Sequence, residues 1–290
     1  MLHHERLRPP SHDYPADEWN VIEKTFHPEF LAQSETMLAL GNGYLGMRGC
    51  PEEGGPNAEN ATLINGFYET WPIVYGEEAY GFAKTGQTIC NVTDSKIIKL
   101  LVDDEPFWLP DARLLSYDRR LNMKSGTLDR EILWETPAGK QVSIRSRRFV
   151  SFDNRHVAAI SYCVTLLNAN AFVVISSEMT ADRLVSRTDT DDPRLAKAFS
   201  GRVLHPRASY SQGRRIVLCH ATEKSRLMVA CATDHALETL CKHTDKTVYT
   251  DDSGQVAFTI EARQDCPIQL IKYIVYHTSE TASAETLRPF

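Results

Sequence analysis

Three groups of adjacent carboxylates are the residues best suited to acid–base chemistry: Glu52-Glu53, Glu77-Glu78 and Asp103-Asp104-Glu105. Cleavage of a glycosidic bond needs two carboxyl groups facing one another across a sugar, or one carboxylic acid with phosphate as the nucleophile. Neighbouring side chains on an extended strand point to opposite faces, so we expect none of the three groups to form such a pair. The run from Asp103 to Glu105 is typical of a solvated turn between strands.

Three arginines lie close together in the segment IRSRRF, at positions 145, 147 and 148. Guanidinium groups match the geometry of phosphate, so the cluster could hold an anion. On a strand, however, Arg145 and Arg147 share one face while Arg148 points to the other. The alternation favours a solvated strand face over a phosphate site.

The segment GNGYLG, from Gly41 to Gly46, has the G-x-G-x-x-G spacing of dinucleotide-binding loops. That fingerprint needs a following helix, whereas Gly49 and Pro51 would end any helix almost at once. Asn-Gly between two apolar runs is instead typical of a tight β-hairpin. We therefore predict a strand-connecting turn here and no nucleotide site.

The seven cysteines and ten histidines show no pattern of a metal site or of a disulfide framework. The cysteines are odd in number and include no C-x-x-C pair, and no histidine stands at metal-ligand spacing from another ligand. His220 follows Cys219 directly, so on a strand the two would point to opposite faces. We expect buried, reduced thiols, structural histidines, no metal and no cofactor.

Aromatic residues crowd the segment from Asn65 to Phe82, with six in eighteen positions of a protein that is 9% aromatic. Such a cluster beside glutamates suits a sugar-stacking surface, a domain interface or a core beneath an irregular loop. The core interpretation buries Phe67, Trp71 and Phe82, whereas the interface interpretation leaves the segment partly exposed in this chain. The candidate substrate-adjacent or interface residues are Tyr68, Trp71, Tyr75, Glu77, Glu78 and Tyr80.

Charge and hydropathy limit the class of partner. A net charge of -6 and a pI near 5.9 argue against electrostatic capture of nucleic acid or of an anionic membrane. No apolar run approaches the roughly 20 residues of a membrane span, and MLHHERLRPPSH at the N-terminus lacks the apolar core of a signal peptide. We expect a cytoplasmic protein that binds neither nucleic acid nor membrane.

Short segments rich in β-branched residues, separated by turn signals, recur along the chain and indicate an all-β fold. In GKQVSIRSRRFVSF the alternation places Val142 and Ile144 on one face of a strand, with Ser143 and Arg145 on the other. HVAAISYCVTLL and FVVISSEM predict two strands joined as a hairpin around Asn168–Ala171.

One long polar segment, from Ala181 to Arg202, interrupts this pattern. Asp191-Asp192 ahead of Pro193 is a helix-start signal. We predict an excursion outside the sheets with one short helix, over Asp192–Phe199.

Three long segments occur in a fixed order: SETMLALGNGYLGMRGCPEEGGP at 34–56, KTGQTICNVTDSKIIKLLVDDEPF at 84–107 and TLDREILWETPAGKQVSIRSRRFVSF at 127–152. Together they resemble the N-terminal domain of glycoside hydrolase family 65, which holds maltose, trehalose and kojibiose phosphorylases and some related hydrolases. The resemblance runs from about Trp19 to about Thr278.

The resemblance implies a large antiparallel β super-sandwich, similar to galactose mutarotase, with little helix. It would span residues 13–278, after a poorly ordered segment 1–12, and 279–290 would begin a linker to an (α/α)6-barrel. In the family that barrel carries the catalytic acid and the phosphate site, so the resemblance implies no catalytic residue in this chain. The parent enzyme would act on an α-linked disaccharide and would form a homodimer. It would be either a phosphorylase, in which inorganic phosphate attacks the sugar, or a hydrolase, in which a second carboxylate activates water.

Two functional classes therefore compete. In the first, the chain is the non-catalytic β domain that braces the barrel, shapes its mouth and contributes to the dimer. In the second, it is an independent carbohydrate-binding module that uses segment 65–82. A third possibility, a free-standing mutarotase-like enzyme, rests only on similarity of fold. Mutarotase chemistry would need a His and a carboxylate facing one another in a cleft, and no sequence motif indicates such a pair.

Overall fold

The computed structural model describes residues 8–73, 75, 77, 79–181, 184–185 and 201–279. Strands dominate this part of the chain, and its helical content is one 3₁₀ turn (Pro28–Phe30) that runs into one α-helix, α1 (Leu31–Met37). The predicted all-β fold with little helix is confirmed. Within the described residues, no helix is long and apolar enough to cross a membrane.

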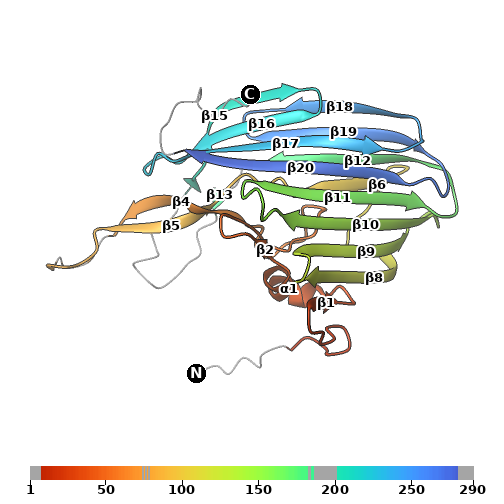
Figure 1. Ribbon diagram of the computed structural model, residues 1–290, viewed down its shortest axis with the longest axis horizontal. Helices are drawn as coiled ribbons and strands as arrows, with labels where there is room; N and C mark the ends of the chain where they lie inside the picture. The colour runs from red at the N-terminus through yellow and green to blue at the C-terminus, as the bar shows by residue number, and fades with distance from the viewer. Residues whose placement is uncertain are drawn as a thin grey trace.

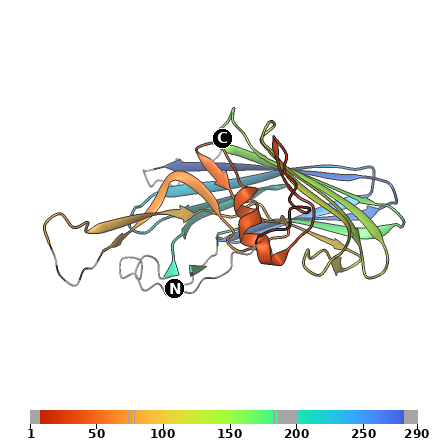
Figure 2. The same cartoon turned by 90° about the horizontal axis from the view of Figure 1, so that it is seen from below.

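The two main sheets form the layers of a sandwich (Figures 1 and 2). The larger sheet is antiparallel, with the strand order β1 (Asn20–Glu23), β8 (Arg113–Asn122), β9 (Thr127–Glu135), β10 (Gln141–Val150), β11 (Val157–Leu166), β20 (Ile268–Ser279), β17 (Met228–Glu238), β16 (Arg215–Ala221) and β15 (His205–Gln212). The smaller sheet has the order β18 (His243–Tyr249), β19 (Ser253–Ala262), β12 (Ala171–Thr180), β6 (Ile98–Val102) and β7 (Glu105–Pro106).

A third sheet leaves the sandwich at one end. It consists of β2 (Leu40–Gly41), β3 (Leu45–Met47), β4 (Thr62–Pro72) and β5 (Thr85–Asn91). The last two strands run outward together, past the ends of the main sheets, and form the orange projection in Figure 1. We call the hairpin of residues 62–91 the β4–β5 arm.

Period-two alternation builds the core between the layers. Val142 and Ile144 of β10 are fully buried in one apolar cluster with Ile175 of β12 and Phe258 of β19, which belong to the opposite sheet. Arg145 points the other way and is exposed. The predicted faces of this strand are confirmed.

The predicted hairpin around Asn168–Ala171 is wrong, although both of its strands exist. β11 pairs with β10 and β20 in the nine-stranded sheet, whereas β12 pairs with β19 and β6 in the five-stranded sheet. The connection therefore crosses from one layer to the other. Alternation tells which face of a strand is buried, but not which neighbouring strand completes its hydrogen bonds.

Two turn predictions are confirmed. Asn42 and Gly43 connect β2 to β3, and the Asn42 side-chain oxygen accepts hydrogen bonds from the amides of Tyr44 at 3.0 Å and Leu45 at 2.8 Å. Gly43 has a φ of 86°, a left-handed conformation that glycine adopts without strain. Asp103 and Asp104 form the turn between β6 and β7.

The excursion at residues 181–202 is described only in part. Its strands β13 (Leu184–Val185) and β14 (Gly201–Arg202) pair with each other, apart from the other sheets. The helix expected over Asp192–Phe199, residues 1–7 of the N-terminal segment and residues 280–290 of the expected linker lie outside the described residues.

Candidate functional site

The β4–β5 arm carries the aromatic segment that the sequence singles out. Its strands pair from Tyr68 opposite Ile89 to Pro72 opposite Thr85. Between Leu63 and Tyr68 the register shifts at a bulge, where Gly66 has a φ of 81°. Bulges bend and twist a strand, which is consistent with the course of the arm away from the sandwich in Figure 2.

Trp71 is buried where the two strands of the arm face each other. It lies opposite Gly86, and a Cβ added at Gly86 would come within 2.5 Å of two atoms of the indole ring. The ring therefore fills the space that any other side chain at position 86 would occupy. Only 8% of Trp71 is exposed, so it is a packing residue of this chain.

Glu69 fixes the arm to the nine-stranded sheet. Its carboxylate accepts hydrogen bonds from the backbone amides of Glu223 at 2.9 Å, Lys224 at 3.0 Å and Ser225 at 2.8 Å, in the turn between β16 and β17. The Ser225 hydroxyl donates to the Tyr68 carbonyl at 2.6 Å. Burial by itself would raise the pKa of Glu69, but these amides hold it below its usual value. The residue is thus an ionised anchor and not a proton donor.

The tip of the arm presents aromatic rings to solvent. Tyr80 is fully exposed and Phe82 is 49% exposed, while the Phe82 ring lies 4.8 Å from that of Tyr75, centre to centre. Glu77 is exposed beside them. The root of the arm, at Glu69 and Trp71, is thus packed into the fold. The tip, at Tyr80 and Phe82, is exposed to solvent and can contact another molecule.

The aromatic candidates are therefore divided between the two interpretations. Phe67 and Trp71 are buried, as the core interpretation requires, but Phe82 is not, so that part of it is wrong. Tyr68 and Tyr75 are half-buried, which leaves Tyr75, Glu77 and Tyr80 as the candidates nearest the tip. Glu78 lies outside the described residues.

The expectation that Glu52 and Glu53 point apart is wrong. The two residues lie in a turn, not on an extended strand, and both carboxylates meet the Arg130 guanidinium. Arg130 Nη2 lies 2.9 Å from Glu52 Oε2 and 2.6 Å from Glu53 Oε1. The flanking Pro51 and Gly54 are the sequence signal for a turn that could have corrected the prediction.

Arg148 completes this buried ionic cluster. Its Nη2 donates to Glu52 Oε1 at 2.7 Å and to the Cys50 carbonyl at 3.0 Å, and none of its surface is exposed. Burial alone would raise the pKa of Glu52, but Arg130 and Arg148 lower it to about 2. A carboxyl group held ionised in this way cannot act as a general acid near neutral pH.

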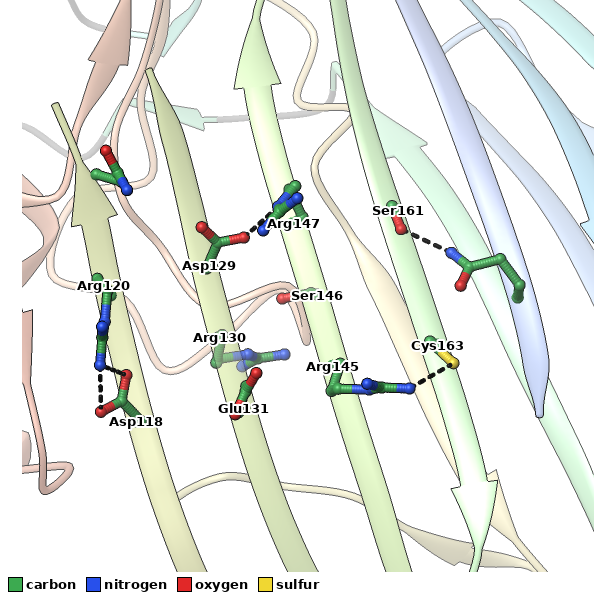
Figure 3. A pocket seen from close by; sticks show the side chains of 12 residues that line it. Asp118, Arg120, Asp129, Arg130, Glu131, Arg145, Ser146, Arg147, Ser161 and Cys163 are labelled. Carbon is green, nitrogen blue, oxygen red and sulfur yellow. Dashed lines mark hydrogen bonds and ion pairs between the residues drawn. The ribbon is translucent and has the colours of Figure 1, made fainter. Parts of the chain in front are cut away.

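The outer face of the nine-stranded sheet carries a polar hollow of about 690 Å³ (Figure 3). Arg147 is paired there with Asp129, and Arg120 with Asp118 at 3.2 Å. Arg145 points its guanidinium toward the Cys163 sulfur, 3.9 Å away. Arg145 and Arg147 share this face and Arg148 points to the other, as predicted. The structure adds that Arg148 is fully buried there. With Arg147 and Arg120 already beside carboxylates, the hollow has the character of a solvated strand face.

Histidine and cysteine form no metal site within the described part of the chain. His220 is buried on the core face of β16 and lies 3.1 Å from Asp252, while Cys219 packs on the opposite face. Burial lowers the pKa of His220, although the carboxylate of Asp252 opposes the shift. The alternation predicted for these two residues is confirmed.

Comparison with known proteins identifies the family. Residues 21–288 match the model of the glycosyl hydrolase family 65 N-terminal domain. The chain is 38% identical over 271 residues to α,α-trehalose phosphorylase of Thermoanaerobacter brockii, covering 92% of this chain and 35% of that protein. It is 36% identical over 275 residues to an uncharacterized glycosyl hydrolase of Mycobacterium tuberculosis, covering 95% of this chain and 35% of that protein.

A kojibiose phosphorylase of Halothermothrix orenii is 31% identical over 159 residues, or 55% of this chain and 19% of that protein. Among solved structures, a human-microbiome protein provisionally named kojibiose phosphorylase superposes with a TM-score of 0.82 at 16% identity, over 97% of this chain and 35% of that one. That similarity shows the fold. The chain thus spans about a third of the length of its first relatives. It belongs to glycosyl hydrolase family 65, in which it matches the N-terminal domain.

Proposed function

We propose that this chain is the non-catalytic β domain of a family 65 disaccharide phosphorylase and that it braces a catalytic barrel in the remainder of the parent protein. The β4–β5 arm carries this proposal. Its root is fixed by Trp71 and Glu69, while Tyr80 and Phe82 stand exposed at its tip. A rigid support that ends in exposed aromatic rings with glutamate at the edge has the composition of an interface core with a polar rim.

The state of the carboxylates supports a structural role. Glu52 is engaged with guanidinium groups and Glu69 with backbone amides, and these partners favour the ionised form of both carboxyl groups. Phosphorolysis needs a carboxylic acid that protonates the leaving oxygen while phosphate attacks the opposite face of the sugar. We place that acid and the phosphate site in the barrel.

The substrate of the parent enzyme is proposed to be an α-linked glucose disaccharide together with inorganic phosphate. Trehalose is the first sugar to test, because the relative with 38% identity is a trehalose phosphorylase, and kojibiose and maltose follow. We also propose a cytoplasmic homodimer. All seven cysteines are free thiols, as a reducing compartment would maintain them.

The proposal is tested by comparing this chain with a longer polypeptide that includes the downstream coding sequence. The 290-residue chain should release no glucose 1-phosphate from trehalose, kojibiose or maltose, whereas the longer polypeptide should release it from at least one of them. Tyr80→Ala with Phe82→Ala should impair assembly or activity of the longer polypeptide. Release of glucose 1-phosphate by the repurified short chain would overturn the assignment.

The exposed tip also keeps a second candidate function open, an independent carbohydrate-binding module. Aromatic rings that stand free in solvent are what a sugar-stacking surface requires. Titration of the isolated chain with trehalose and maltose, followed by calorimetry, separates the two functions. Binding that is lost in Tyr80→Ala would favour the module, and the absence of binding would favour the bracing role.

A further inference from the structure

Strand β5 forms an open edge of the third sheet (Figure 1). It stands at the end of the strand order β2-β3-β4-β5, and β4 is its one neighbour within the described part of the chain. Its sequence, TGQTICN, contains neither a charged residue nor a proline, and Ile89 on its outer face is 47% exposed. A seven-residue edge of this composition is a ready template for another strand.

The edges of the two main sheets are protected in the ways that natural proteins use. β15 carries Pro206 and Arg207, and its register shifts just after Pro206. β18 carries Asp245 and Lys246, β7 is two residues long and ends in Pro106, and β1 has only four residues. β5 has none of these features, since the bulge of the arm adds its extra residues to β4. The contrast indicates that the edge of β5 is covered in the assembled protein.

The pairing with β4 fixes which backbone groups of β5 point to the open edge. The Ile73 amide donates to the Lys84 carbonyl at 3.0 Å, so these two residues form a hydrogen-bonded pair. Hydrogen-bonded and non-hydrogen-bonded pairs alternate along an antiparallel ladder. Along the register of β5, the amides and carbonyls of Thr85, Gln87 and Ile89 therefore point away from β4.

We propose that β5 pairs with β5 of a second copy of this chain, antiparallel and about a twofold axis. The outward groups are all paired when Gln87 lies opposite its counterpart in the second copy, because Thr85 then lies opposite the other copy's Ile89. Each of these residues exchanges both of its backbone hydrogen bonds with the other copy. The two third sheets become one continuous sheet, which is a recurring mode of recognition. This pairing rests on the homodimer of the proposed function and gives it a location.

A second copy fits the edge because the edge is complementary to itself. Twofold pairing brings the same patch of both copies together, and like charges opposite one another would be destabilising. β5 carries no charge that could repel its counterpart. Thr85 and Ile89, which meet across the axis, are β-branched residues on the exposed face of the strand, and such pairs favour a sheet.

The pairing also gives the exposed tip of the arm a surface to contact. In an antiparallel arrangement centred on Gln87, the tip of each arm points toward the root of the other arm, where β5 ends at Asn91. Tyr80 is fully exposed and Phe82 is 49% exposed at this tip. Strand pairing alone buries little surface, so these rings would supply much of the apolar area that a stable interface needs.

The first test measures the oligomeric state of the 290-residue chain by sedimentation over a range of concentrations. The wild type should show an equilibrium between monomer and dimer. Ile89→Lys should weaken the dimer by roughly tenfold or more, because a lysine at an edge disfavours pairing with another strand. Val248→Lys is the matched control, since Val248 is also 47% exposed and lies on the edge strand β18, and it should leave the equilibrium unchanged.

The second test addresses the backbone pairing and its register. Gln87→Pro removes an outward amide without removing a bond to β4, so it should weaken the dimer while the arm stays paired. Gln87→Cys places two thiols opposite one another, at the roughly 5.5 Å between Cα atoms that a disulfide can span. Under mild oxidation it should form a covalent dimer faster than Thr85→Cys, whose counterpart lies farther along the strand.

The proposal is overturned if the wild-type chain is monomeric at every concentration, if Ile89→Lys and Val248→Lys weaken the dimer equally, or if Thr85→Cys cross-links faster than Gln87→Cys. It is also overturned if the amides of Thr85, Gln87 and Ile89 resist hydrogen exchange in a monomeric longer polypeptide, because the remainder of the parent protein would then cover the edge. None of these measurements uses catalysis. Their failure is therefore distinguishable from failure of the proposed function, which is judged by release of glucose 1-phosphate.

Discussion

Glu53 and Arg130 meet through two parallel hydrogen bonds inside the protein, from Nη1 to Oε2 at 2.8 Å and from Nη2 to Oε1 at 2.6 Å. Both side chains are buried, and the same guanidinium also reaches Glu52. The arrangement ties the turn after β3 to strand β9 of the nine-stranded sheet. A charge buried with its partner is tolerated, whereas a charge left alone is costly.

Arg148→Met should destabilise the chain by about 3–5 kcal/mol, because it leaves the Glu52 carboxylate buried with one cation fewer. Arg147→Met is the matched control on the next residue of the same strand. Its exposed pair with Asp129 should contribute less than about 1 kcal/mol. Urea unfolding of both variants measures the difference, and equal losses would show that the buried cluster is not a special determinant of stability.

The stability of the fold should fall as the pH is lowered from 6.5 to about 4, in part through His235. Burial, and then the nearby Lys272, lower the pKa of this histidine from 6.5 to about 4, against the opposing hydrogen bond to the Arg214 carbonyl. Between pH 6.5 and about 4, the unfolded chain therefore binds a proton at His235 that the folded chain does not bind. The stability that comes from neutral His235 is present above pH 6.5 and is lost as the pH falls toward 4. The largest slope from one such group is about 1.4 kcal/mol per pH unit.

Neutral His235 is held between two partners, the Arg214 carbonyl at 2.9 Å and the Ser177 hydroxyl at 2.7 Å. Urea unfolding at several pH values should show a smaller slope for His235→Gln than for the wild type. His243→Gln, at an exposed position of β18, should retain the wild-type slope. An unchanged slope in His235→Gln would assign the acid sensitivity to other groups.

Trp71→Ala should cost about 3–5 kcal/mol in this chain, because it removes a large buried ring and leaves a void over Gly86. Tyr80→Ala, at the tip of the same arm, should change stability by no more than about 0.5 kcal/mol. Denaturant melts of the two variants check both values. A small effect of Trp71→Ala would return this residue to the interface interpretation.

Glu69→Gln should loosen the β4–β5 arm from the turn between β16 and β17. The glutamine has one acceptor oxygen where the carboxylate has two, and the carboxylate serves the amides of residues 223–225 and of Thr70. Hydrogen exchange at residues 223–225 should become faster, since charge-assisted bonds to backbone amides are lost. Exchange at Val142 and Ile144 in the core should be unchanged and serves as the internal reference.

Local sequence determined the features that depend on residues next to one another. Asn42-Gly43 predicts its turn because glycine accepts a positive φ and the asparagine oxygen caps the following amides. Alternation in β10 predicts that Val142 and Ile144 face the core, because successive side chains of a strand point to opposite faces. The all-β class follows from the repetition of such segments.

Only the tertiary structure decided the features that join distant segments. Glu53 finds its partner 77 residues away, and Glu52 finds Arg148 at a separation of 96 residues. β11 and β12 are neighbours in sequence and yet belong to different sheets, because period-two alternation is the same in a hairpin and in a connection between layers. Likewise, the aromatic segment can be recognised from its composition. The burial of Trp71 and the exposure of Tyr80, however, depend on how β5 and residues 223–225 pack against β4.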